Sequence, residues 1–208
     1  MQDFFDITVN LARILGAIAF ILGIIRYSRL TGTEKWYVFY LFVVFCIEYI
    51  SYGLSLFTSD GNNRFLYPIY IAGEFFTITA VFIKKLNLGK YCFIATGLLS
   101  LFFLLADQLL PADLYKNDYS KGITNLIIIC LTGYTLLQEI KKGNGKDRFS
   151  DVDKMIFLYF TVSIFIFIFQ NQLMEFPIAY FIAFWTVNNL LCCLLYVLFI
   201  KTFLTLKK

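Results

Sequence analysis

The sequence predicts an all-α integral membrane protein with seven transmembrane helices, the N-terminus outside and the C-terminus in the cytoplasm. The first observation is compositional: of 208 residues, 60% are hydrophobic and 15% are charged, and the mean hydropathy is +0.74. Soluble domains average roughly 25% charged residues, and a soluble fold of this length could not bury so much apolar surface. The second observation is that Lys and Arg are frequent in every other loop along the chain.

Seven apolar segments make up most of the chain, and each is close to the roughly 20 residues that a helix needs to cross a bilayer. They cover residues 7–26, 36–57, 65–84, 91–110, 122–140, 155–172 and 177–200. Continuous apolar runs, such as Ile127 to Leu131 and Ile164 to Phe169, favour helices over the alternating strands of an outer-membrane barrel. The hydrophilic stretches between the segments are too short for a further domain, so we expect a single domain over residues 1–208.

The direction of each helix follows from the charges that flank it. Met1 to Asp6 hold two Asp and no basic residue, and no small-residue cleavage site follows, so we expect the first helix to stay in the mature protein. The loops after the second, fourth and sixth segments hold only Arg64, Lys116 and Lys121. Short loops rich in Lys and Arg stay in the cytoplasm. Such residues follow the first, third, fifth and seventh segments: Arg26, Arg29, Lys35, Lys84, Lys85, Lys90, Lys141, Lys142, Lys146, Arg148, Lys154, Lys201, Lys207 and Lys208.

Several kinds of chemistry are excluded or disfavoured by the residue types. The chain has no histidine, which excludes His-based zinc sites, Ser-His and Cys-His hydrolytic arrangements and haem ligation by His. No nucleic-acid motif is present. We therefore expect no enzyme activity, no metal and no cofactor. The five cysteines show no C-x-x-C spacing and are interpreted as small buried apolar side chains: Cys46, Cys92, Cys130, Cys192 and Cys193.

A small set of polar side chains lies inside the apolar segments, most of them in the outer half of the membrane. Arg13 is the only cation that we expect there. Helical spacing places aromatic side chains on the same faces as the acids and amides, since residues four apart lie one above the other. The candidate ligand-binding or buried polar cluster is Arg13, Glu48, Tyr52, Tyr70, Glu74, Asn125, Gln170, Trp185, Asn188 and Asn189.

Two interpretations of this cluster remain open. An unpaired charge at the bilayer centre costs at least about 2.5 to 3.5 kcal/mol, so Glu48 and Glu74 should face the bundle interior. In one interpretation Arg13 bridges one or both glutamates as an internal clamp, and the asparagines form interhelical hydrogen bonds. In the other, the residues line a cavity open to the outer face, where one cation against two carboxylates suits a small polar ligand of cationic character. Two neighbouring buried acids would also suit proton coupling.

Weak internal similarity relates the first three helices to the last three. Such a 3+1+3 arrangement, with the fourth helix as an inverting connector, is a parallel repeat of the kind found in transporters. The matching positions are Asn10-Leu11 with Asn125-Leu126, Lys35 and Tyr40 with Lys154 and Tyr159, and Tyr67-Pro68-Ile69 with Phe176-Pro177-Ile178. This topology, with Pro68, Pro177 and the Trp185 to Asn188 stretch, resembles the SWEET sugar carriers and the PnuC vitamin carriers, and the resemblance implies a small-solute carrier.

A second resemblance covers more of the chain. Its residues are Glu48 with Tyr49 and Tyr52, Ile69-Tyr70 with Glu74-Phe75, and Trp185 with Asn188 and Asn189. The pattern is similar to uncharacterised seven-helix inner-membrane proteins of Bacteroidota. It implies the fold and the bacterial inner (cytoplasmic) membrane as the compartment, and no activity.

Three function classes remain open. The first is an inner-membrane protein that binds, and transports, a small polar solute through an outward-facing pocket. The second is a membrane signalling or accessory subunit, in which the basic loop Lys141 to Lys154 contacts a cytoplasmic protein partner. The third is an intramembrane enzyme acting on lipid, with Glu48 and Glu74 as acid and base. The expected partners are thus the lipid bilayer, a small-molecule ligand and a protein at that loop.

Overall fold

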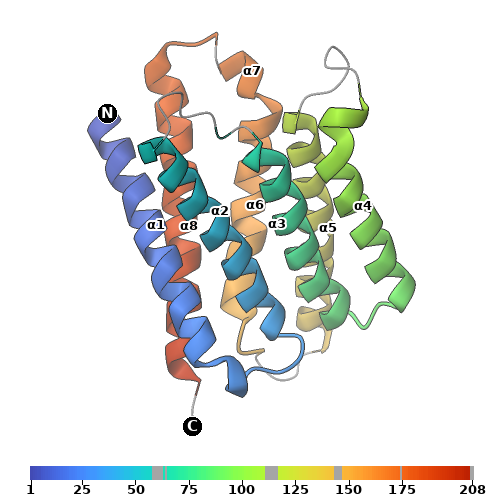
Figure 1. The fold of residues 1–208 in the computed structure, drawn as a ribbon. Coiled ribbons are helices and arrows are strands. Elements are labelled where there is room, and N and C mark those ends of the chain that lie inside the picture. The colour runs from blue at the N-terminus through green and yellow to red at the C-terminus, as the bar shows by residue number, and fades with distance from the viewer. Residues whose placement is uncertain (58–62, 64, 111–116, 143–146, 174, 207–208) are drawn as a thin grey trace.

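The structure, a computed structural model, describes residues 1–57, 63, 65–110, 117–142, 147–173 and 175–206, and it is helical throughout this part of the chain. The all-helical class predicted from the sequence is confirmed. The elements run up and down a single bundle (Figure 1): α1 (Gln2–Ile25), the 3-10 turn η1 (Tyr27–Arg29), α2 (Lys35–Phe57), α3 (Leu66–Lys85), α4 (Lys90–Leu109), α5 (Asn117–Lys142), α6 (Ser150–Ile168), the short α7 (Gln170–Leu173) and α8 (Ile178–Thr205).

Some helix bounds differ from the predicted ones. The predicted helix over 155–172 is divided into α6 and α7, which are separated at Phe169. Helix α5 begins at Asn117 instead of 122, and α8 continues to Thr205 instead of 200. The predicted bounds follow the apolar runs, whereas backbone hydrogen bonding continues into the polar residues beside them. The earlier start of α5 brings Lys121 into a helix.

Within the described residues, six helices are long and apolar enough to cross a membrane: α1, α2, α3, α4, α5 and α8. Helix α6 also runs the length of the bundle, but it carries Asp151, Asp153 and Lys154 near its start. Soluble proteins rarely expose large contiguous apolar patches. The outer face of α1 alone exposes a continuous row of apolar side chains. The protein therefore has the surface of a multi-pass membrane protein. The row is Ile7, Leu11, Ile14, Ile18, Ile21 and Ile25.

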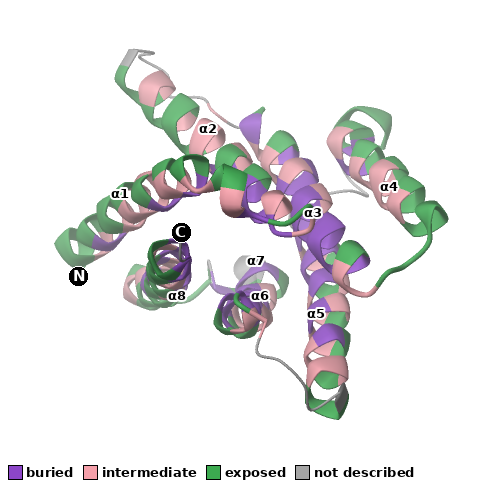
Figure 2. Cartoon of the chain, turned by 90° about the horizontal axis from the view of Figure 1, so that it is seen from below, coloured by how far each residue is buried: buried purple, intermediate pink, exposed green. Residues whose placement is uncertain are grey.

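The helices α1, α2, α3, α5, α6 and α8 form a closed ring, in that order, with α8 returning to α1. Helix α4 packs against α3 on the outside of the ring (Figure 2). The most buried candidate span is α3, with 72% of its apolar window inside the protein against 28% or less for the others. Any charge on α3 must therefore find a partner inside the protein.

The end of the bundle that holds the C-terminus of the chain is called the lower end here, as in Figure 1. Two local motifs fix helix ends there. Before α2, the backbone N–H of Thr31 donates to the Glu34 carboxylate at 2.7 Å, and the N–H of Glu34 donates to the Thr31 hydroxyl at 3.4 Å. This is a capping box. After α3, Asn87 takes the left-handed conformation (φ 52°), and the N–H of Leu88 donates to the carbonyl of Ile83 at 2.9 Å. This Schellman motif ends α3 immediately beyond Lys85.

Helices α2 and α3 approach closely at Gly73. A Cβ atom at this position would lie 2.7 Å from Cγ1 of Val43, inside van der Waals contact. A valine side chain has few rotamers in a helix, so it cannot easily move aside. Gly53, on α2, has no neighbour within 4 Å of such a Cβ and serves as a matched control.

We expect Gly73→Ala to lower the free energy of unfolding by about 1 to 3 kcal/mol relative to Gly53→Ala, because overpacking separates α2 from α3. At Gly53 the alanine should stabilise the helix by about 0.5 to 1 kcal/mol. Denaturant titration of both variants in detergent measures the difference. Equal stabilities would show that α2 and α3 can separate without cost.

Candidate functional site

A cavity of about 1050 Å³ lies inside the ring, toward the upper end that holds the N-terminus. Its walls come mainly from α1, α2, α3 and α8, with Tyr159 and Phe167 from α6. Asn63 and Phe65, in the connection between α2 and α3, lie at its rim, and Phe65 is 58% exposed. The cavity therefore opens at the upper end.

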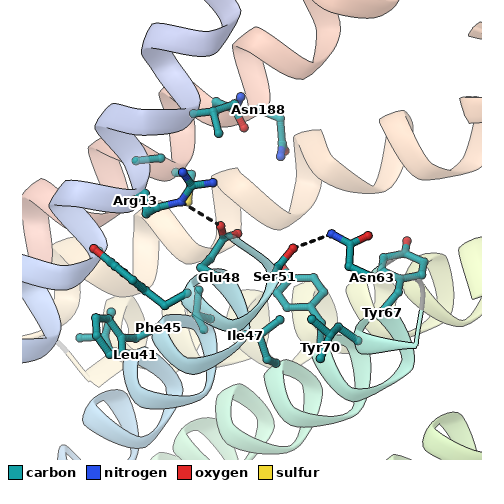
Figure 3. Close-up of a pocket in the computed structure, with 18 of the residues that line it drawn as sticks. Arg13, Leu41, Phe45, Ile47, Glu48, Ser51, Asn63, Tyr67, Tyr70 and Asn188 are labelled. Carbon is teal, nitrogen blue, oxygen red and sulfur yellow. Dashed lines mark hydrogen bonds and ion pairs between the residues drawn. The ribbon is translucent and has the colours of Figure 1, made fainter. Parts of the chain in front are cut away.

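One wall carries a cation beside a carboxylate (Figure 3). Arg13 on α1 and Glu48 on α2 approach with Nε and Oε2 3.8 Å apart. The arginine is also held by the Asn10 side chain, which accepts from Nη1 at 3.2 Å, and by the Tyr52 ring, whose centroid is 4.4 Å from Cζ. The expected pairing of Arg13 with a glutamate is thus present, and its glutamate is Glu48.

The α8 wall presents three polar side chains spaced along one face, Trp185, Asn188 and Asn189. Trp185 Nε1, Asn188 Oδ1 and Asn189 Nδ2 are all buried, and none has a hydrogen-bond partner among the described residues. Arg13 Nε is in the same state. Unpaired buried polar atoms are rare in folded proteins, and each one requires an explanation. Among the described residues, these are four of five such atoms, and all four belong to residues that line one cavity; the fifth is Asn125 Oδ1.

Phenol side chains form the deepest part of the cavity. Tyr40, Tyr159 and Tyr196 line it and are each 5% exposed or less. No motif groups them, because they come from three different helices, α2, α6 and α8. Tyr40 and Tyr159 occupy equivalent positions in the proposed internal repeat, which was the only signal that could have joined two of them.

Glu74 pairs with a second buried cation, Lys121, and not with Arg13. The interpretation of Arg13 as the only cation inside the bundle is therefore wrong. Lys121 of α5 is 1% exposed and forms an ion pair with the Glu74 carboxylate. The Tyr70 hydroxyl donates to the same carboxylate at 2.7 Å, and its ring lies 4.5 Å from the Lys121 ammonium. Lys121 was predicted in an outer loop because α5 begins earlier than its apolar run. Glu74 and Lys121 are not among the described residues that line the cavity. Tyr70, which binds Glu74, does line it.

The predicted cluster is thus divided among several environments. Asn125 is fully buried and donates to the Ser163 hydroxyl at 3.4 Å, which links α5 to α6. Tyr52 supports Arg13 from outside the cavity lining. The side chain of Gln170 is not among the described parts of the structure. The predicted residues that do line the cavity are Arg13, Glu48, Tyr70, Trp185, Asn188 and Asn189.

A second polar network, which the sequence did not reveal, closes the lower end of the bundle. Asp153 of α6 is fully buried, accepts a hydrogen bond from the Tyr37 hydroxyl and forms an ion pair with Lys85 of α3. The Tyr37 ring stacks on Phe149 with centroids 4.5 Å apart. Phe199 meets the edge of Tyr37 at 5.7 Å. Phe199 also packs against Tyr40, which lines the cavity, with ring centroids 6.2 Å apart.

The basic loop contributes to this closure. Arg148 binds Glu34 through two hydrogen bonds of 3.0 and 2.6 Å, and Asp147 lies 2.6 Å from Lys85. Partial burial raises the pKa of the Asp147 carboxyl, but the Lys85 ammonium and the N–H of Phe149 hold that pKa below its ordinary value. Asp147 is therefore charged at neutral pH. In the described part of the loop, residues 147–149 contact the protein's own helices.

No family model, curated protein or solved structure matches this chain. The function must therefore be argued from the cavity and the two charge networks.

The Glu74–Lys121 pair gives a direct test of the internal arrangement. We expect Glu74→Gln to lower the free energy of unfolding by about 3 to 5 kcal/mol, because it leaves the Lys121 ammonium buried and unpaired. The double variant Glu74→Gln, Lys121→Met removes both charges and should recover most of the loss. Denaturant titration in detergent measures all three proteins.

The matched control is Lys154→Gln, which breaks an exposed pair with Asp151 (3.5 Å). Surface pairs contribute about 0 to 1 kcal/mol, so this variant should unfold like the wild type. A double variant as unstable as Glu74→Gln alone would show that the loss does not come from the unpaired charge.

Proposed function

We propose that this protein binds a small polar solute in the upper cavity and carries it across the bacterial inner membrane. The observation that carries the proposal is the group of buried polar atoms in the cavity wall that have no hydrogen-bond partner in the described structure: Arg13 Nε, Trp185 Nε1, Asn188 Oδ1 and Asn189 Nδ2. Leaving a buried donor or acceptor unsatisfied costs about 1 to 3 kcal/mol per group. A solute that hydrogen-bonds to them recovers this cost on binding.

The distribution of charge supports an outward-facing cavity. The described basic residues of the loops, including Arg26, Lys35, Lys85, Arg148 and Lys201, gather at the lower end of the bundle. By the positive-inside rule this end faces the cytoplasm, and the cavity then opens to the outside. Arg64, Lys116, Lys146, Lys207 and Lys208, which also entered the predicted topology, are not among the described residues.

The arrangement of the helices supports transport as well as binding. In the ring, α1, α2 and α3 are followed by α5, α6 and α8, which is the order that a parallel repeat about a central axis requires. The cavity lies between these two triplets. Below it, the contacts of Lys85 with Asp153 and of Glu34 with Arg148 also join one triplet to the other. A carrier of this kind would open its inner side by parting these contacts while the outer side closes.

The binding step is tested by thermal unfolding of the detergent-purified protein against a panel of polar metabolites. A solute at a hundred times its dissociation constant should add about 2.7 kcal/mol of stability. This gain should be lost in Asn188→Leu and Trp185→Phe, which remove unpaired polar groups.

Lys154→Gln, far from the cavity at the lower end, should keep the full gain. Uptake of the stabilising solute into proteoliposomes then separates carriage from binding alone. No stabilising solute in a broad panel would contradict the proposal and favour a purely structural role for the polar wall.

A further inference from the structure

The wall of the cavity between α1 and α2 carries one cation and one carboxylate, Arg13 and Glu48. From the sequence we expected one cation against two carboxylates, which would favour a cationic ligand. The structure removes Glu74 from this count, because Lys121 neutralises it behind Tyr70. Arg13 and Glu48 remain as the charged pair in the wall. Asp107 of α4 also lines the cavity, at an exposed position.

Arg13 and Glu48 face each other without being hydrogen-bonded. Their 3.8 Å separation exceeds the range of a hydrogen bond. Arg13 keeps its place through Asn10 and Tyr52, so its orientation does not depend on Glu48. Among the described residues, no group donates a hydrogen bond to the Glu48 carboxylate, which is 50% exposed toward the cavity side. The pair therefore offers a free donor and a free acceptor side by side.

This arrangement selects ligands by charge. A ligand with only a cationic group would be attracted by Glu48 but repelled by Arg13. A ligand with only an anionic group would be attracted by Arg13 but repelled by Glu48. A molecule with both groups satisfies the two side chains together, through charge-assisted hydrogen bonds that are stronger than neutral ones. The apolar part of such a molecule can pack against Phe45 and Phe167, and the α8 amides remain for further polar atoms.

We propose that the solute of this cavity is a small zwitterion with an ammonium group and a carboxylate, as in an amino acid, whose carboxylate binds Arg13 and whose ammonium binds Glu48. This inference rests on the proposed function, because it names the class of solute for the same cavity.

The experiment measures binding of the standard amino acids to the purified protein by thermal unfolding and calorimetry. The best binder is then compared with its methyl ester, which lacks the carboxylate, and its N-acetyl derivative, which lacks the ammonium. Both derivatives should bind about tenfold to a hundredfold more weakly than the amino acid, as expected for the loss of one charge-assisted hydrogen bond. Glycerophosphoethanolamine serves as a probe for a lipid-type zwitterion with phosphate in place of carboxylate.

Variants assign each group of the ligand to its side chain. Arg13→Gln should weaken binding of the amino acid by a similar factor but strengthen binding of the ester, whose ammonium no longer meets the Arg13 charge. Glu48→Gln should weaken binding of the amino acid but strengthen binding of the N-acetyl derivative, whose carboxylate no longer meets the Glu48 charge. Lys154→Gln should change none of these affinities. If either charge variant fails to fold, Asn10→Ala, which frees the Arg13 side chain, tests the carboxylate contact and should weaken the amino acid more than the ester.

The outcomes separate this inference from the proposed function. The inference is overturned if no amino acid binds, if the ester or N-acetyl derivative binds as tightly as its parent, or if only glycerophosphoethanolamine binds. In each case, another polar solute that stabilises the wild type but not Asn188→Leu would leave the proposed function intact. Failure of every solute would remove both.

Discussion

The position of α3 depends on the neutralisation of Glu74. This helix lies in the middle of the bundle between α2, α4 and α5, and its carboxylate is 1% exposed. An isolated charge at such a place would be very costly, so Lys121 and the Tyr70 hydroxyl are required around it. Because Tyr70 also lines the cavity, the same contact shapes the inner wall of the site. The ion pair thus joins the stability of the ring to the form of the cavity.

The two ends of the bundle solve the problem of buried polarity differently. At the lower end Asp153, Lys85 and Tyr37 satisfy one another beneath stacked aromatic rings. At the upper end the polar groups of Trp185 and Asn188 have atoms without partners in the described structure. This contrast supports the proposal that the upper end binds a ligand.

The helices could be predicted from the sequence because hydropathy is a property of continuous segments. The pairing of Arg13 with a glutamate was also predictable, since both side chains lie at a similar depth in neighbouring helices. The partner of Glu74 was not, because Lys121 is 47 residues away and follows a polar stretch in which the start of α5 leaves no hydrophobic signal. The ion pair between Asp153 and Lys85 at the lower end was missed for a related reason. Both residues flank loops, where charged side chains are used to predict the direction of the helices and not contacts between them. The buried polar atoms without hydrogen-bond partners could not be predicted either, because they depend on how the side chains pack in three dimensions.

The closed lower end has an electrical consequence. If the cavity opens to the outside, as proposed, water in it would bring the potential of the outer solution part of the way into the bundle. The membrane voltage would then fall mainly across the layer that contains the packed rings of Tyr37, Phe149 and Phe199. Moving one elementary charge through 100 mV involves about 2.3 kcal/mol. In the proposed carrier, a solute of zero net charge would cross that layer without electrical work, and its movement would then be driven by its concentration difference and not by the membrane voltage.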